Sequence, residues 1–163
     1  MAVFVAFFLF AIGLGTLIEY LLHRFFLHSR LRNWLTRRHK LHHKTSVRYS
    51  LLSEFAGFFP GAVPFLWIGF IHSPAAGGAF VLGSVAYVFL VALCHKWSHE
   101  APGRLFWLNP NVHALHHARG PKWNFGVTTA FWDRVFGTYR VPPARPPGAG
   151  QRGPQVKVTH HAG

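Results

Sequence analysis

The chain has 163 residues, of which half are hydrophobic and only four are acidic, and its 17 lysines and arginines give a formal net charge of +13. The length suits one domain, and so apolar a chain is either a membrane protein or an unusually apolar globular protein. The single cysteine, Cys94, excludes an internal disulfide and a zinc site built from cysteines, and we assign it no role. Nucleic-acid binding would also suit the basic charge, but long uncharged runs separate the basic segments and argue against that partner.

Residues 1–18 form the first uncharged run, which Glu19 closes. About 20 mostly apolar residues are needed to cross a bilayer, so we expect a membrane-spanning helix over about 2–22. The run has neither a basic start nor a small-residue cleavage site, which favours a retained helix over a signal peptide. The basic segment that follows, 29–49, contains Trp34 and Leu35 and is typical of a helix lying at the membrane surface.

The second uncharged run, 55–94, is long enough for two spans, and the turn signal at 72–74 divides it. We expect one helix over 51–71 and another over about 77–97. Because the former contains Pro60 and Pro64, it is predicted to be kinked or to lie partly in the interface. The sequence therefore predicts an all-α integral membrane protein with three to four embedded helices and a helical cap.

Two parts of the chain are distinguished by composition. Residues 1–140 are predicted to form the membrane domain, the last part of which (102–140) mixes polar and aromatic residues. Residues 141–163 are rich in proline and glycine, which predicts a disordered tail.

The basic residues predict the orientation. Eight lie within 24–48 and nine within 96–157, whereas the turn between the last two spans has none. This is the positive-inside pattern. We therefore expect the N-terminus outside and the basic segments on the cytoplasmic side, in a bacterial inner membrane.

Ten of the 13 histidines fall into four clusters with the spacings HX4H, HX2HH, HX3H and HX2HH. The clusters are His23 and His28; His39, His42 and His43; His95 and His99; and His113, His116 and His117. Imidazole is the commonest side-chain metal ligand, and four clusters on one membrane face predict metal binding. His72, on the opposite face, and His160 and His161, in the tail, are not expected to be ligands.

Helical spacing explains how each cluster can act as a unit. Residues at i, i+3 and i+4 share one helix face, so HX2HH presents three imidazoles together. His95 and His99 form a matching pair. His23 and His28 are five residues apart and would point away from each other, so the first helix is predicted to end or bend between them.

Ligand type alone does not select the metal, because imidazole suits zinc, copper, nickel and iron. Ten ligands exceed the four of one tetrahedral zinc and suit two ions of higher coordination number, as in a dinuclear iron site. Acidic neighbours that orient the rings would strengthen the site, and three candidates lie near the clusters. They are Glu19, Glu100 and Asp133, of which Glu19 is favoured because a carboxylate at a membrane helix end needs a partner.

The order of the clusters and the sequence around them resemble those of the fatty acid hydroxylase superfamily. These are membrane di-iron enzymes that include sterol desaturases, fatty acid 2-hydroxylases and carotene hydroxylases. The resembling segments are EYLLHRFFLH (19–28), RHKLHH (38–43), NFGVTT (124–129) and WDRVFGTY (132–139), within a match over about 18–139. The resemblance implies that the ten histidines hold two iron ions, and that O2 is the co-substrate for hydroxylating or desaturating a lipid C–H bond.

Within the superfamily, the HX3H third cluster and the FWDRVFGTY segment favour a fatty-acyl or related lipid hydroxylase. A carotenoid ring hydroxylase or a sterol desaturase-type enzyme remains the alternative. No cytochrome b5-like segment is recognised, so a separate reductase, ferredoxin or cytochrome b5-type donor is expected to supply electrons. The basic face would steer an acidic carrier toward it.

Two hypotheses of another kind are open. A non-enzymatic, histidine-rich membrane metal binder would use the same ligands, although a transporter should place them along a path through the membrane. A haem protein would need only paired axial histidines, and four clusters exceed that requirement.

Overall fold

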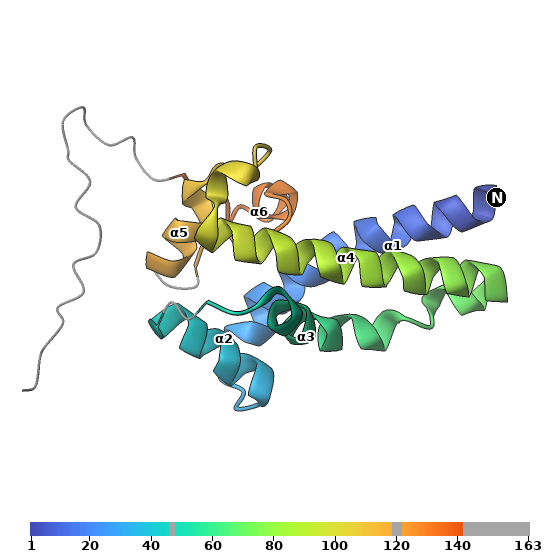
Figure 1. Cartoon of the computed structure of the whole chain (residues 1–163), viewed down its shortest axis with the longest axis horizontal. Coiled ribbons are helices and arrows are strands. Elements are labelled where there is room, and N and C mark those ends of the chain that lie inside the picture. The colour runs from blue at the N-terminus through green and yellow to red at the C-terminus, as the bar shows by residue number, and fades with distance from the viewer. Residues whose placement is uncertain (46–47, 119–121, 142–163) are drawn as a thin grey trace, which may run out of the picture.

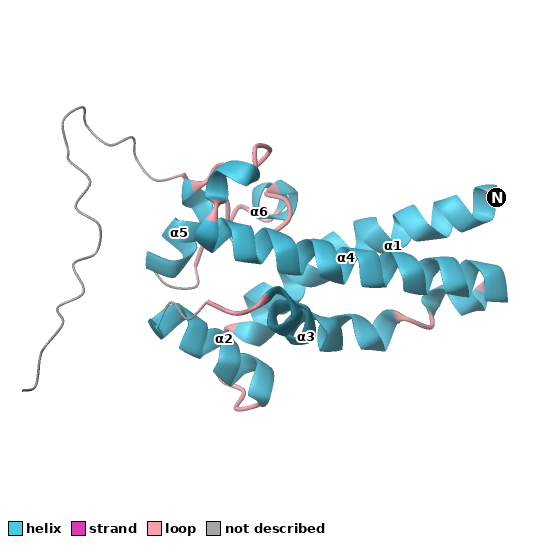
Figure 2. Ribbon diagram, viewed as in Figure 1, coloured by secondary structure: helices cyan, strands magenta, loops and turns pink. Residues whose placement is uncertain are grey.

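The computed structural model describes residues 1–45, 48–118 and 122–141, and these residues form helices and loops only (Figures 1 and 2). The predicted all-α fold class is confirmed. Residues 142–163 of the predicted tail, with His160 and His161, lie outside the described residues.

Three helical segments are long and apolar enough to cross a membrane. The first is α1 (Ala2–Leu21), which continues as a π-helix, η1 (Leu22–Leu27). The second is α3 (Leu51–Ala62) with two 3-10 turns, η2 (Val63–Phe65) and η3 (Ile68–Ile71). The third is α4 (Pro74–Glu100). The three spans predicted from the apolar runs are confirmed.

The second span is irregular, as its prolines predicted. Pro60 lies inside α3, the α-helix ends at Ala62, and Pro64 lies in the following 3-10 turn. Proline has no amide hydrogen and its ring clashes with the preceding turn, so the regular hydrogen-bond pattern cannot continue through both positions.

The third span is longer than the expected 77–97. The Ser73 side chain accepts a hydrogen bond from the Ala76 amide at 3.2 Å, and Pro74 occupies the first helical turn. A serine cap followed by proline is a strong helix start, so the two glycines at 77 and 78 are absorbed into the helix. At its other end, α4 extends to Glu100.

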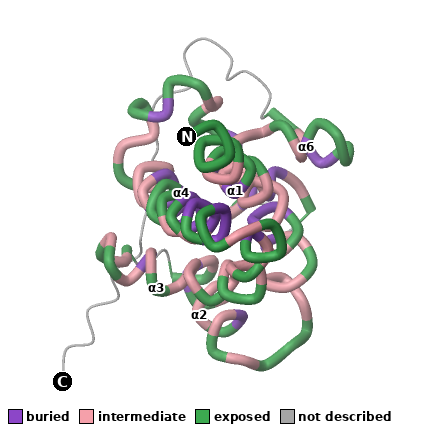
Figure 3. Tube along the Cα trace, turned by 90° about the vertical axis from the view of Figure 1, so that its right-hand side faces the viewer, coloured by how far each residue is buried: buried purple, intermediate pink, exposed green. Residues whose placement is uncertain are grey.

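Close contact between α1 and α4 depends on small residues. A Cβ atom at Gly83 would lie 2.5 Å from the Phe8 carbonyl oxygen and 2.9 Å from the Ala11 Cβ. On α1, Gly15 lies against the ring of Tyr87. Figure 3 shows that α4 carries many buried residues, whereas the N-terminal part of α1 is largely exposed, as is suitable for a helix facing lipid.

The remaining helices gather at one end of the three spans. They are α2 (Trp34–Thr45), η4 (Pro102–Arg104), α5 (Asn111–Ala118) and α6 (Phe131–Val135). This end is opposite to the N-terminus (Figure 1). The surface helix expected over 29–49 is shorter in the structure, because Asn33 caps α2 by accepting a hydrogen bond from the Thr36 amide at 3.0 Å.

We expect Gly83→Ala to destabilise the protein by about 1–3 kcal/mol, the usual effect of overpacking, because the added methyl meets backbone of α1. Thermal unfolding in detergent measures the change. The matched control is Gly13→Ala, where nothing lies within 4 Å of the added Cβ. Equal melting temperatures for the two variants would contradict this view of the α1–α4 contact.

Candidate metal centre

All ten clustered histidines lie at the end of the spans where α2, α5 and α6 gather (Figure 1), which we call the cap end, and they form two groups of five. The first group is His23, His28, His39, His43 and His116, and the second is His42, His95, His99, His113 and His117. Within each group, one ring nitrogen from every residue lies within 4.8 Å of those of the others. The structure therefore brings together all ten histidines that the sequence singled out.

The π-helix explains how His23 and His28 reach the same group. The helical segment ends between them, at Leu27, as predicted. The π-helix η1 replaces the α-helix from Leu22 onward, and the two rings stack with centroids 5.1 Å apart. A π-helix bonds i to i+5, which is the spacing of the two histidines. The wider turn thus brings onto one face two side chains that an α-helix would separate.

Each HX2HH motif divides its histidines between the two groups. On α2, His39 and His43 join the first group while His42 joins the second; on α5, His113 and His117 join the second and His116 joins the first. The i, i+4 pair lies on one side of each helix, and the third histidine points to its flank. Both helices therefore contribute ligands to each group.

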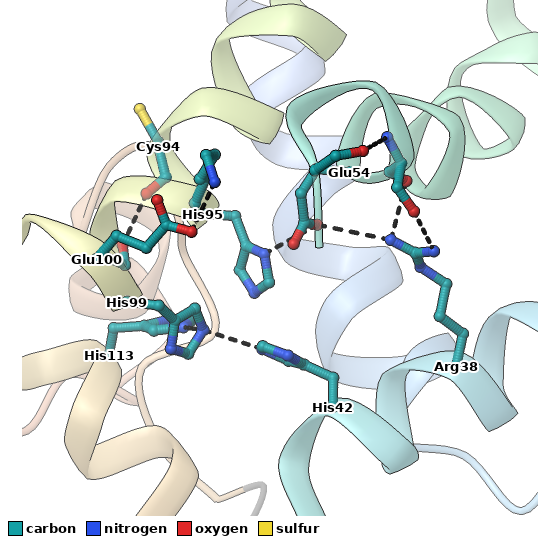
Figure 4. A network of polar contacts seen from close by, with 12 residues as sticks. Arg38, His42, Glu54, Cys94, His95, His99, Glu100 and His113 are labelled. Atoms are coloured by element: carbon teal, nitrogen blue, oxygen red, sulfur yellow. Dashed lines mark hydrogen bonds and ion pairs between the residues drawn. The ribbon is translucent and has the colours of Figure 1, made fainter. Parts of the chain in front are cut away.

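Distances between ring nitrogens match those of metal ligands. In the first group, His28 Nε2 lies 3.0 Å from His39 Nε2 and 3.1 Å from His116 Nε2. In the second, His99 Nε2 lies 2.9 Å from both His42 Nε2 and His113 Nε2 (Figure 4). Ligands at right angles on an ion with bonds of about 2.1 Å lie about 3.0 Å apart, whereas tetrahedral ligands lie about 3.4 Å apart. The spacing suits coordination numbers of five or six.

Hydrogen bonding between imidazoles cannot account for this arrangement. A ring nitrogen carries either one proton or one lone pair, yet His28 Nε2 and His99 Nε2 each face two other Nε2 atoms. In addition, His23 Nε2 and His117 Nε2 are buried without a hydrogen-bond partner in the described part of the chain. Lone pairs that converge on one point fit a metal ion.

The histidines of the cap are held in the neutral form that metal binding requires. Burial, together with nearby imidazoles, lowers the pKa of His28 and of His43 to about 3. Burial likewise lowers the pKa of His116 to about 4, partly offset by its backbone hydrogen bond. These side chains carry a free lone pair at neutral pH without help from a metal.

Asp133 supports the first group through a peptide bond. His23 Nδ1 donates a hydrogen bond to the Phe125 carbonyl at 2.5 Å, and the Gly126 amide of the same peptide donates to Asp133 Oδ2 at 2.8 Å. A second backbone carbonyl, that of Trp123, accepts from His116 Nδ1 at 2.7 Å. Both imidazoles therefore hold their proton on Nδ1 and direct Nε2 into the group.

Glu19 supports the histidines indirectly, through the loop that follows Phe125. Its carboxylate accepts hydrogen bonds from the Val127 amide at 2.5 Å, the Tyr87 hydroxyl at 2.5 Å and the Thr128 hydroxyl at 2.8 Å. The partner expected for a carboxylate at a membrane helix end is thus the loop that carries Phe125. Glu19 fixes this loop between α1 and α4, and the loop in turn holds His23.

The carboxylates of Glu100 and Glu54 make contacts that the sequence did not predict. Glu100 forms an ion pair with Lys96 at 2.6 Å, one turn back on α4. Glu54, which lies outside the predicted set, is buried with Oε2 3.1 Å from His95 Nδ1 (Figure 4). The signal that could have found it is the one used for Glu19, a carboxylate at the end of an apolar run.

An apolar cavity of about 300 Å³ leads to the first group. It lies between α1, α3 and α4 and extends alongside α1 from Ala11 to His23, about 18 Å at 1.5 Å per residue. A smaller cavity of about 40 Å³ touches His39, His42 and His95, and shares Leu27, Leu35, Gly57 and Phe58 with the larger one. The two cavities are therefore neighbours, and between them their linings include histidines of both groups.

Residues that were given no ligand role lie apart from the two groups. His72 is at the opposite end of the spans, where it stacks on Phe7 with ring centroids 5.2 Å apart. Cys94 is fully buried in the apolar core with Tyr87 and Val91.

Comparison with known proteins agrees with this site. The model of the fatty acid hydroxylase family matches residues 8–138. The chain belongs to the fatty acid hydroxylase family. Among its relatives, the ceramide very long chain fatty acid hydroxylase of Saccharomyces cerevisiae is 34% identical over 84% of this chain and 39% of its own length. A dihydroceramide fatty acyl 2-hydroxylase of Arabidopsis thaliana is 30% identical over 78% of this chain and 57% of its own length.

The ornithine lipid hydroxylase of Rhizobium tropici is 25% identical over 82% of this chain and 43% of its own length. The chain thus spans well under two thirds of the length of these relatives. No solved structure matches significantly.

We expect the full chain, purified in detergent with Fe2+ under anaerobic conditions, to hold two ions. His28→Ala and His99→Ala should each lower the metal content to about one ion, because each removes a nitrogen that faces two others in its group. Elemental analysis measures the content, and His72→Ala is the control that should retain both. Loss of both ions from either single variant would argue for one shared site.

Proposed function

We propose that this protein is a membrane di-iron oxygenase that hydroxylates a fatty-acyl chain of a membrane lipid. Its five-histidine groups would each hold one iron ion. Two iron ions there would supply reductive activation of O2 and removal of hydrogen from an unactivated C–H bond. In the balanced reaction, the C–H carbon gains one oxygen atom and the other leaves as water, using two electrons and two protons from a donor.

The observation that carries the proposal is the apolar cavity that ends at the histidines. Its walls come from the three segments long enough to span a membrane, and its volume lies in the range of small-molecule sites. An alkyl chain from the bilayer can enter such a space without leaving an apolar environment. His23 lines one end, so a chain carbon is guided toward the metal groups.

Residues of the protein would position the acyl chain and exclude water. Leu27, Leu35 and Phe58 line both cavities and would form an apolar passage beside the histidines. Phe26 also lines the larger cavity. Exclusion of bulk water at this passage would protect a reactive oxidant from side reactions.

The relatives favour hydroxylation of an acyl lipid over the alternatives. The three named above are hydroxylases of ceramide, dihydroceramide fatty acyl or ornithine lipid substrates. A carotenoid ring or a sterol is broad and rigid, whereas the cavity has a volume of only about 300 Å³ and extends along α1. A flexible acyl chain fits better.

Electrons would come from an acidic carrier that binds the cap from the cytoplasmic side. Exposed basic residues lie on and around α2: Arg30, Arg32, Arg37, Lys44 and Arg48. The positive electrostatic potential of these residues would steer an anionic partner toward the cap. The same basic residues argue that the cap faces the cytoplasm and the N-terminus lies outside.

Lipid mass spectrometry of cells with and without the protein tests the activity. We expect a lipid species heavier by one oxygen, absent when His42→Ala replaces the wild type, because His42 both joins the second group and lines the small cavity. A loss of two hydrogens would instead identify a desaturase. Metal uptake without any oxygen-dependent lipid product would favour the non-enzymatic binder.

Gly61→Phe should block the cavity, since Gly61 lines it and faces Leu22. We expect at least about tenfold less hydroxylated lipid, equivalent to about 1.4 kcal/mol, with the metal content unchanged. Gly78→Phe, which enters open space near the start of α4, is the matched control. Equal product from the two variants would show that the acyl chain takes another route.

A further inference from the structure

Glu54 is a buried carboxylate in direct contact with one of the histidines. Its Oε2 lies 3.1 Å from His95 Nδ1, and the residues are each 5% exposed. The separation is that of a hydrogen bond, although the Nδ1–H direction is not aligned with the oxygen and the contact is therefore mainly electrostatic. A carboxylate is costly to bury without a partner, so this contact needs a reason.

The position of Glu54 is fixed from two sides. Ser50 caps α3, its side chain accepting from the Ser53 amide, and its carbonyl accepts the Glu54 amide at 2.9 Å. Across from it, Arg38 of α2 lies 4.0 Å from the carboxylate and donates to the Ser53 hydroxyl at 2.9 Å and the Ser53 carbonyl at 2.8 Å (Figure 4). The Arg38 guanidinium also stacks 3.7 Å from the centre of the Tyr49 ring.

A carboxylate beside Nδ1 determines what the other nitrogen of the ring can do. It favours the tautomer with the proton on Nδ1, which leaves the lone pair on Nε2 for a metal. It also raises the basicity of that lone pair and holds the ring orientation. His95 belongs to the second group, so these effects apply to that group directly.

The first group has no equivalent contact among the described residues. His23 and His116 donate to backbone carbonyls, and the nearest carboxylate, Asp133, reaches His23 only through the peptide between Phe125 and Gly126. A neutral carbonyl is a weaker partner than a carboxylate. The two groups therefore differ in the partners of their rings although each contains five imidazoles, because only the second has a histidine in contact with a carboxylate among the described residues.

We propose that Glu54 is a positioning residue that makes the two metal sites unequal, by orienting and polarising His95 so that the second group binds its ion more tightly. The inference rests on the proposed metal centre. It assigns to α3, which contributes no histidine to either group, a direct part in the site.

Glu54→Gln tests the inference by removing the charge while keeping the shape of the side chain. Fe2+ is titrated anaerobically into the full chain in detergent, in competition with a chelator. In wild type we expect two unequal affinities, and in the variant a 10- to 100-fold loss confined to one ion, the usual effect of removing such a partner. Mössbauer spectra of iron-57 should show one ferrous doublet changed and the other unchanged.

Two variants separate positioning from general destabilisation. Glu54→Asp keeps the charge and should recover part of the lost affinity. Glu100→Gln removes a different carboxylate at the end of α4, one that pairs with Lys96, and should leave both affinities unchanged. In a His99→Ala background, Glu54→Gln should have no further effect on iron affinity, whereas in a His28→Ala background it should weaken the remaining ion.

The outcomes are distinguishable. Wild-type affinities in Glu54→Gln, or an equal loss at both sites, would overturn the role of Glu54 while leaving the metal centre in place. A wild-type protein that bound no iron would overturn the proposed centre itself. None of these measurements depends on lipid turnover.

Discussion

Ten imidazoles converge in two groups of five from helices that are far apart in the chain, and the rest of the structure depends on this constraint. His28 and His116, 88 residues apart, have ring nitrogens 3.1 Å from each other. Such an arrangement places unpartnered polar atoms in a buried space, as at His23 Nε2 and His117 Nε2. Because burying such atoms costs free energy, the scaffold must be rigid enough to hold the rings in place.

The scaffold obtains this rigidity from two different sources. Between the spans, small residues such as Gly83 let α1 and α4 approach until a backbone carbonyl occupies the place of a side chain. At the cap end, buried carboxylates bind backbone amides: Glu19 and Asp133 hold successive amides of the loop from Phe125 to Thr128. This loop connects the membrane helices to the histidines, so changes in it would be transmitted to the first group.

Most of the architecture was predictable because it depends on local sequence. Apolar runs of sufficient length gave the three spans, and Pro60 and Pro64 gave the irregular second one. The helix end between His23 and His28 was predicted, but the π-helix that precedes it was not, because 100° per residue was assumed beyond Leu21. A π-helix changes this angle, and its occurrence depends on the neighbours against which the turn packs, which the chain order does not state.

The sequence by itself determined the chemistry of the site: which ligands are present, how many there are, and that the clusters lie at the same end of the spans. These follow from residue type, spacing and hydrophobic length, all of which are local. Only the tertiary structure decided how the ten histidines divide into two groups, that Glu54 contacts His95 while Glu100 pairs with Lys96, and that an apolar cavity reaches His23. The physical reason is that these features arise between helices, and the packing angle between two helices is set by side chains from distant parts of the chain.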